Sequence, residues 1–419
     1  MQRIVGVDTA RGLAILGMFV AHLGMQRHTG LLTPTGWFFV TDGRPSALFA
    51  LLAGVGLAFM TRRALASGDE VEWQRQRIRI VKRSLVLYLL GWALTFVGTP
   101  VAVILPAYAV MFLLMLPFLK LRTPALLAWA AGILLVAQLP VVAVRQEIGE
   151  SSPWRIVPGI GELLTGYYPA ISWIAYLLVG LAVGRTALRS VRTQLVLLGA
   201  GVAAAVVGYG AGALLTRALR PTPDSFGELL VSTQPHTDSA VEMVGNTGVA
   251  VAVIALCLLV TRVPVPRVLL TPVSASGAMS LTVYSLHIVY IRFLGDDAVW
   301  YPTSNWPLIA LVLATFVLAT AWQLLWGQGP FERAMHALIR SRPPTAQPTW
   351  TSPPHPAPGT PGQGPTAQPT WPSPPRPGTV VPPAAGPPAP SSRPATGPAA
   401  GAVAAPAGRW PDPHALGRR

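Results

Sequence analysis

The sequence predicts an all-α integral membrane protein, a polytopic bundle of about ten transmembrane helices followed by a disordered tail. Three observations lead to this fold class. The 419 residues are 52% hydrophobic and only 11% charged, whereas soluble domains carry about 25% charged residues. The apolar residues gather in long runs, and the basic residues gather in short clusters between the runs. A chain of this composition cannot cover a water-facing surface, so lipid must cover much of it.

Ten apolar runs are candidates for transmembrane helices, which need about 20 consecutive, mostly apolar residues. Some of the runs reach this length only with tilt or interfacial extension, and the second and sixth are the shortest. Gly54 and Gly56 lie inside such a run and are expected to be close-packing sites. The predicted helices are residues 9–26, 44–60, 84–99, 102–119, 125–144, 168–184, 193–215, 240–261, 275–293 and 307–326.

The basic residues predict the orientation in the membrane. Every second loop is rich in Lys and Arg, and the loops between them hold few basic residues and most of the acidic ones. Lys and Arg mark the cytoplasmic side, so we expect a multi-pass protein of the plasma membrane with both termini in the cytoplasm. The net charge of +15 therefore argues for membrane orientation and not for nucleic-acid binding. The strongest cluster follows the second run and holds Arg62, Arg63, Arg75, Arg77, Arg79, Lys82 and Arg83.

Residues 343–419 form a second region, distinct from the predicted transmembrane domain at 1–342. This region holds 24 of the 43 prolines, and the segment that begins at Pro344 recurs at Pro365. Proline lacks an N–H group, and the apolar residues are too few for a core. The tail is predicted to be disordered and partly polyproline II. It is expected to act as a plain tether; the alternative is a ligand for an aromatic-lined partner domain of unknown identity.

The first predicted helix, with the residue that directly precedes it, carries three ionisable residues, and an ionisable residue inside lipid is a functional candidate because its burial is costly. Arg11 and His22 are eleven residues apart, which is about 20° past three full turns and about 16 Å along the axis. They therefore share a face, and Asp8 lies within about 60° of both. We expect Asp8 and Arg11 at the cytoplasmic mouth and His22 past mid-depth. Alternatively, Arg11 is an orientation anchor and His22 makes an interhelical hydrogen bond.

Polar residues also line three later helices. Ser280, Tyr284 and His287 follow the i, i+4, i+7 spacing of one helical face. Glu242 needs a partner inside the bundle, either His287 or His236. Tyr168, Ser172 and Tyr176 form a third stripe. Together the stripes predict a polar interior open to the outside, the alternative being polar contacts that hold helices together.

The first outside loop adds two further candidates, His28 and Arg44. Arg44 is expected either to anchor at the interface or to bind an anionic group, and His28 is expected to be a solvated loop residue. The sequence has no zinc pattern, phosphate loop or dinucleotide fingerprint. We therefore expect no metal and no tightly bound cofactor.

The opening segment Val7-Asp8-Thr-Ala-Arg11-Gly12-Leu-Ala resembles the start of heparan-alpha-glucosaminide N-acetyltransferase and its bacterial relatives. The spacing of Arg11 and His22 is similar to the Arg-x10-His motif of integral-membrane O-acyltransferases that modify surface glycans. The segment from Gly277 to Tyr284, with Gly329-Pro-Phe-Glu332-Arg, is similar to an uncharacterised bacterial membrane family. The resemblance covers residues 1–340.

The resemblance implies a multi-helix fold that moves an acyl group from cytoplasmic acyl-CoA to an acceptor at the membrane. It also implies that His22 is the catalytic histidine and that Arg11 serves near the acyl-CoA. In the heparan enzyme the proposed active histidine follows the first helix, in a lumenal loop, where this chain offers only His28. We favour His22.

These observations predict a membrane acyltransferase, in the simplest case an acetyltransferase, that uses acyl-CoA (acetyl-CoA) as co-substrate. The CoA phosphates would meet Arg11 and the basic loop 62–83, with Arg44 as a second candidate. The catalytic candidates are His22, Asp8, His287 and Glu242. The acceptor, a sugar of an envelope glycan or a glycolipid, would enter from outside.

Two other interpretations remain open. A polar cavity with His and Glu at mid-depth also suits a proton-coupled secondary transporter or permease. Such carriers usually show internal repeats and broken helices in matching halves, and the sequence indicates neither. A third interpretation is a membrane scaffold whose working part is the proline-rich tail.

The charge pattern generates a direct prediction of topology. A reporter that is active only outside the cell should work when fused after residue 155 or 225 and be silent after residue 70 or 190. Activity after residue 70 would overturn the orientation, because that loop carries the strongest basic bias.

Overall fold

The computed structural model describes residues 3–25, 33–148, 153–155, 157–223 and 225–339. His28 and the tail at 343–419 lie outside these ranges. Within them the structure is helical and has no strand, which confirms the predicted all-α class. The main helices are α1 (Val5–Leu23), α2 (Arg44–Ser67), α3 (Glu70–Thr95), α4 (Leu105–Leu114), α5 (Thr123–Val136), α6 (Gln138–Ile148), α7 (Ala170–Gly184), α8 (Val191–Leu219), α10 (Ala240–Val260), α12 (Thr271–Ala278), α13 (Ser280–Leu294), α15 (Trp306–Trp326) and α16 (Pro330–Ile339).

Short helices connect these elements. The α-helical ones are α9 (Phe226–Val231), α11 (Pro264–Leu269) and α14 (Asp297–Trp300). The others are the 3₁₀ helices η1 (Pro34–Thr41), η2 (Leu116–Lys120) and η3 (Pro153–Arg155), and the π-helical turn η4 (Gly161–Thr165).

Six helical segments of the described chain are long and apolar enough to cross a membrane. They are α1, α2, α5 with α6, α8, α10 and α15. A seventh span is possible if α12 and α13 count as one. The other three predicted runs also fall in helices, but α4 and α7 have only 10 and 15 residues, and the start of α3 is rich in charge. The count of about ten spans therefore stays a prediction.

The predicted helix at 275–293 is broken, which corrects the sequence analysis. Helices α12 and α13 meet at Met279 with a bend of 89°. The N-terminus of α13 is capped by the carboxylate of Glu332, which accepts hydrogen bonds from the N–H of Leu281 at 2.7 Å and from the hydroxyl of Thr282 at 2.6 Å. A carboxylate is favourable at this position because it satisfies N–H groups that have no partner within the helix.

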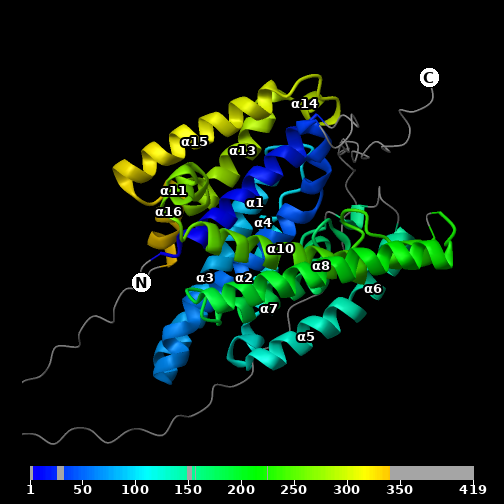
Figure 1. Ribbon diagram of the computed structural model, residues 1–419, viewed down its shortest axis with the longest axis horizontal. Coiled ribbons are helices and arrows are strands. Elements are labelled where there is room, and N and C mark those ends of the chain that lie inside the picture. Colours follow the sequence, from blue (N-terminus) through cyan, green and yellow to red (C-terminus); the bar gives the residue numbers. More distant parts are fainter. Residues whose placement is uncertain (1–2, 26–32, 149–152, 156, 224, 340–419) are drawn as a thin grey trace, which may run out of the picture. The chain divides into compact units, whose positions relative to one another are not determined.

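Glycines set the closest helix contacts, as expected for membrane bundles, where small residues let backbones approach. A Cβ atom on Gly54 of α2 would lie 2.1 Å from the carbonyl oxygen of Leu177 in α7, and one on Gly180 would lie 1.9 Å from that of Leu51. The close-packing role predicted for Gly54 is confirmed. Helices α8 and α10 run side by side in the same manner (Figure 1).

The contact between α1 and α12 is the closest of these. A Cβ atom on Gly12 would lie 2.0 Å from the carbonyl oxygen of Val273, and one on Gly277 would lie 1.8 Å from that of Asp8. Neither position accepts a side chain without moving a backbone. This contact holds α1 against the broken helix.

Replacing Gly277 with alanine should therefore destabilise the fold. The new methyl group would force α1 and α12 apart, and we expect a fall of several degrees in the unfolding temperature measured in detergent. Gly199→Ala is the matched control, because a Cβ atom at Gly199 of α8 has nothing within 4 Å; alanine should there be neutral or mildly stabilising. Equal unfolding temperatures for the two variants would contradict the close-contact argument.

Candidate functional site

The N-terminal end of α1 carries a compact charge cluster. The Asp8 carboxylate lies 3.1 Å from Nε of Arg3 and 3.4 Å from Nη1 of Arg11. The Arg11 guanidinium lies against α2, where a Cβ atom on Gly56 would make an ordinary contact with Nη2 at 3.6 Å. The side chain of Arg11 remains 26% exposed, so an anion can still reach it.

Arg83 of α3 joins this cluster. It interacts electrostatically with Arg11 and with Glu332, and its Nε is shielded from solvent with no hydrogen-bond partner among the described residues. Glu332 is already engaged as the cap of α13. The cluster thus combines more guanidinium groups than free carboxylates, which favours a bound anion.

The other end of α1 brings two histidines together. His22 Nδ1 lies 3.4 Å from His287 Nε2, and His287 Nδ1 also contacts the backbone carbonyl oxygen of Tyr284. His287 is fully buried and packs against Phe19 and Tyr284, whereas His22 is only half-buried. Of the two imidazoles, only His22 can meet a substrate.

A third histidine, His236, lies in the segment between α9 and α10. It is close enough to His22 for the two imidazoles to interact electrostatically. Its ring contacts the rings of Tyr167, Tyr168 and Trp173, at centroid distances of 6.0, 5.5 and 6.2 Å. Its Nδ1 is buried and has no hydrogen-bond partner in the described part of the chain. Burial and the positive charge of Arg145 lower the pKa of His236 to about 4, so the imidazole is neutral at physiological pH.

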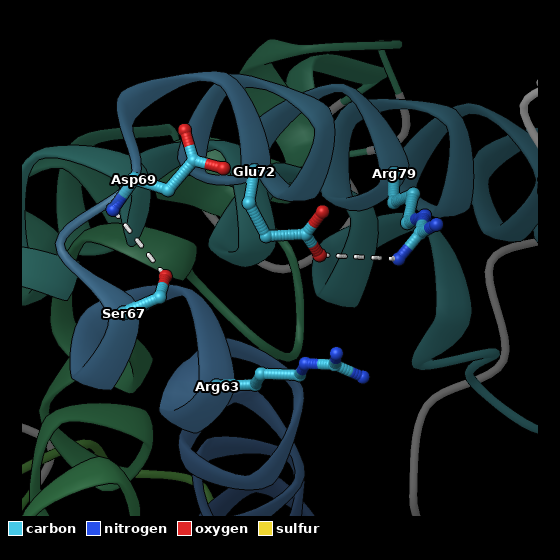
Figure 2. A pocket seen from close by; sticks show the side chains of 5 residues that line it. All are labelled: Arg63, Ser67, Asp69, Glu72 and Arg79. Carbon is cyan, nitrogen blue, oxygen red and sulfur yellow. Dashed lines mark hydrogen bonds and ion pairs between the residues drawn. The ribbon is translucent and has the colours of Figure 1, made fainter.

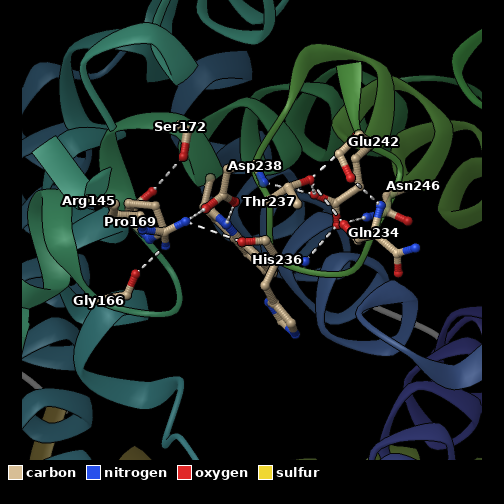
Figure 3. Close-up of polar contacts among 12 residues, drawn as sticks. Arg145, Gly166, Pro169, Ser172, Gln234, His236, Thr237, Asp238, Glu242 and Asn246 are labelled. Atoms are coloured by element: carbon tan, nitrogen blue, oxygen red, sulfur yellow. Dashed lines mark hydrogen bonds and ion pairs between the residues drawn. The ribbon is translucent and has the colours of Figure 1, made fainter. Parts of the chain in front are cut away.

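The backbone that carries His236 is strained. His236 and Asp238 have φ angles of 63° and 57°, which side-chain-bearing residues adopt at a cost and which cluster at functional sites. Asp238 accepts hydrogen bonds at 2.6 Å from both Arg145 and the indole of Trp173. Figure 3 shows Arg145 and Asp238 at one side of this loop and Glu242 and Asn246 at the other.

Glu242 fastens the loop from its other side. Its two carboxylate oxygens accept four hydrogen bonds, from the N–H groups of His236 (3.0 Å) and Asp238 (2.8 Å), and from the side chains of Thr237 and Asn246 (3.1 Å each). Glu242 therefore binds the backbone of His236 and of its neighbours. The alternative prediction, that the His287 imidazole is the partner of Glu242, is wrong. With these hydrogen bonds, Glu242 holds the loop in place.

Arg44 is tied to the same network. Its Nε donates to the Tyr209 hydroxyl at 2.9 Å, and that hydroxyl donates to Oδ1 of Asn246 at 2.6 Å. The guanidinium also lies over the Tyr209 ring and donates to the carbonyl of Phe39. These contacts favour the anchoring role that was expected for Arg44 over anion binding.

An open cavity of about 370 Å³ lies where α2 ends and α3 begins (Figure 2). Arg63 and Arg79 line it together with Ser67, Asp69 and Glu72. Glu72 lies 3.9 Å from Arg79, and Figure 2 shows Arg63 extended beside this pair. Arg63 is seven residues beyond Gly56, about 10 Å along α2, so the cavity lies on the far side of Arg11 from His22.

The structure thus distributes the predicted site residues over three places. His22 and His287 meet; Asp8 and Arg11 meet about 16–21 Å away along α1; Glu242 and Arg44 share the loop network. The sequence analysis missed Arg83 and Arg145 as individual site residues and considered His236 only as a partner for Glu242. The polar segment Pro235-His-Thr-Asp238 directly before an apolar helix was the signal for His236. In the described chain, no group of three His, Cys, Asp or Glu side chains is placed to hold a metal ion.

Comparisons with known proteins bear on this arrangement. Residues 3–215, about half of the chain, match the family described as heparan-alpha-glucosaminide N-acetyltransferase, catalytic. Residues 189–342 match a family described as a protein of unknown function, DUF418. The chain is 24% identical over 376 residues to an "Uncharacterized 39.9 kDa protein in amylase 3'region" of Bacillus acidopullulyticus, covering 81% of this chain and 95% of that protein. No solved structure matches the chain. The resemblances seen at both ends of the transmembrane region are confirmed.

The lowered pKa of His236 predicts a pH dependence of stability. Its pKa is about 4 in the fold and about 6.5 in the unfolded chain. Between these values the unfolded chain binds the proton more readily, so His236 lowers stability as the pH falls from about 6.5 to about 4. Thermal unfolding in detergent from pH 7.5 to 4.5 should therefore show a shallower loss for His236→Gln than for the wild type.

The exposed His336 of α16 provides the control. His336→Gln should keep the wild-type slope. Parallel curves for wild type and His236→Gln would show that the His236 imidazole takes up a proton in the folded protein as easily as in the unfolded chain.

Proposed function

The chain belongs to the family of heparan-alpha-glucosaminide N-acetyltransferase catalytic domains, and from this premise we propose that it is a membrane acyltransferase that uses acyl-CoA, in the simplest case acetyl-CoA. The acceptor would be a sugar of an envelope glycan or a glycolipid. The observation that carries the proposal is the half-buried His22, held by His287 at one end of α1, with an arginine cluster about 16 Å away at the other end.

The arginine cluster suits the phosphates of CoA. Arg11 and Arg83 offer guanidinium donors, which bind phosphate oxygens in a planar, often bidentate geometry. Arg63 and Arg79 line the open cavity farther along α2 and α3. In the predicted orientation this end faces the cytoplasm, where acyl-CoA is made. The pantetheine arm would then run along α1 and bring the thioester to His22.

His22 is suited to act as general base. The acceptor hydroxyl or amine would lose its proton to His22 as its oxygen or nitrogen attacks the thioester carbonyl carbon. The carbon–sulfur bond then breaks, and His22 returns the proton to the departing thiolate. A positioned base of this kind contributes about 10²–10⁴-fold to a rate.

The aromatic side chains around His236 suit the acceptor. Tyr167, Tyr168 and Trp173 combine apolar ring faces with polar edges, a combination that fits the alternating C–H and O–H surface of a sugar. The electrostatic interaction between His236 and His22 supports an acceptor site on the same side of the bundle as the proposed base. A sugar that rests on these rings would present its hydroxyl or amine toward His22.

One observation favours a second candidate, a proton-coupled transporter. The 89° break between α12 and α13 resembles the discontinuous helices of carriers, and the sequence analysis had expected no break. The described chain contains only one such bent pair, whereas carriers with inverted repeats place broken helices in both halves. Thiol release from acetyl-CoA by the purified protein, screened against glycan acceptors, separates the two functions; a protein that moves substrate without releasing CoA would be a carrier.

The division of roles along α1 yields a test by mutation. His22→Ala should lower acyl transfer by about 10²–10⁴-fold and leave acyl-CoA binding nearly unchanged. Arg11→Ala should weaken acyl-CoA binding more than it slows turnover of the bound substrate. The measurements are thiol release for kcat and calorimetric titration for binding.

Two controls complete this test. His22→Gln keeps hydrogen bonding but cannot titrate, so a restored rate would reduce His22 to an interhelical contact. His336→Ala removes an exposed histidine of α16 and should change neither quantity. A His22→Ala rate within tenfold of wild type would move the proposal to His28.

A further inference from the structure

A backbone carbonyl determines which nitrogen of His287 carries the proton. His287 Nδ1 lies within hydrogen-bond distance of the carbonyl oxygen of Tyr284, one turn earlier in α13. A carbonyl oxygen can only accept, so Nδ1 must carry the hydrogen. His287 is fully buried, and in the described part of the chain the aromatic rings that contact it are those of Phe19, Tyr284 and His22. A charged imidazolium would be costly there, so the ring is neutral and its Nε2 is a bare acceptor.

The two imidazoles meet edge to edge. Nε2 of His287 and Nδ1 of His22 are 3.4 Å apart, and the ring planes are within 8° of parallel with centroids 5.5 Å apart. The centroid separation exceeds the nitrogen separation by 5.5 − 3.4 = 2.1 Å, close to two ring radii. The two nitrogens therefore lie nearly on the line between the ring centres, in the plane of both rings. This is the direction of an N–H···N hydrogen bond and not of a face-to-face stack.

The direction of this hydrogen bond follows. Because His287 Nε2 can only accept, His22 Nδ1 must donate, which leaves His22 Nε2 with its lone pair. In the described part of the chain Nε2 of His22 has no hydrogen-bond partner, and the side chain is only half-buried. We propose that His287 is a positioning residue that fixes His22 in the Nδ1–H tautomer and thereby makes Nε2 of His22 the basic atom.

In the proposed acyl transfer, this arrangement would orient and activate the base. The part of the inference that concerns catalysis rests on that proposed function. When Nε2 of His22 takes the acceptor proton, the positive charge on the imidazolium is stabilised through Nδ1–H by His287 Nε2. A second group that orients the base and stabilises its charged form is the arrangement of a Ser-His-Asp triad, where loss of the orienting group lowers kcat about 10⁴-fold. Here a neutral imidazole takes that place, as suits a site where a carboxylate would be expensive to bury.

The tautomer can be measured without any activity. The full-length protein, labelled with ¹⁵N in its seven histidines and purified in detergent, should give a His22 signal with protonated Nδ1 and bare Nε2, assigned by its loss in His22→Gln. In His287→Met the same signal should move toward a mixture of tautomers, because methionine offers no strong acceptor. A His22 signal with protonated Nε2 in the wild type, or one unchanged in His287→Met, would overturn the proposal.

A matched pair of variants tests the consequence for turnover. Gln and Met are similar in length, but only the Gln side-chain oxygen can accept the His22 N–H. His287→Gln should keep kcat within about threefold of wild type, and His287→Met should lower it by more than tenfold with KM unchanged. Equal kcat values for the two variants would show that His287 acts only through packing. If the wild-type protein releases no CoA from any acceptor screened, the proposed function fails, and the NMR result still decides the tautomer.

Discussion

The contact between α1 and α12 at Gly12 and Gly277 is the constraint on which the rest of the candidate site depends. Each glycine approaches a carbonyl oxygen of the other helix so closely that no side chain fits. Lipid offers apolar helices no hydrophobic reason to associate, so close van der Waals packing of this kind holds them together. The bend of 89° at Met279 then directs α13 away from α12. With α1 fixed against α12, this direction brings His287 to His22, and Glu332, which caps α13, interacts electrostatically with Arg83 and Arg11.

The carboxylates of the bundle are engaged in holding structure. Asp8 pairs with two arginines, Asp238 binds Arg145 and Trp173, and Glu332 caps α13. Glu242 accepts four hydrogen bonds from its own loop and helix. These hydrogen bonds and ion pairs offset the free-energy cost of removing each carboxylate from water, as a buried charge requires. The half-buried His22 imidazole and the Arg11 and Arg83 guanidiniums remain the groups to which the proposed function assigns proton transfer and phosphate binding.

Both family matches contribute to the same centre. The acetyltransferase family match at 3–215 holds Arg11, His22 and Arg83, and the DUF418 match at 189–342 holds His236, His287 and Glu332. The pairing of His22 with His287 joins residues 265 positions apart. The second half of the transmembrane region therefore completes the site that the first half begins, which gives the uncharacterised part of the chain a defined place in the proposed chemistry.

The sequence by itself determined the helical membrane class. Composition and the length of the apolar runs show which segments prefer lipid to water, and this preference does not depend on which residues meet in the fold. The sequence also singled out Arg11, His22 and His287, because a polar group inside an apolar run is visible without any partner. Only the tertiary structure decided which of these groups meet. The break at Met279 lies inside an apolar run and leaves no trace in hydropathy. The left-handed backbone at His236 and Asp238 is held by Glu242 of the following helix and, through Asp238, by Arg145 and Trp173, which are distant in sequence. Partners brought together by helix packing cannot be found from the periodicity of one helix, since that periodicity gives the direction of a side chain and not what it faces.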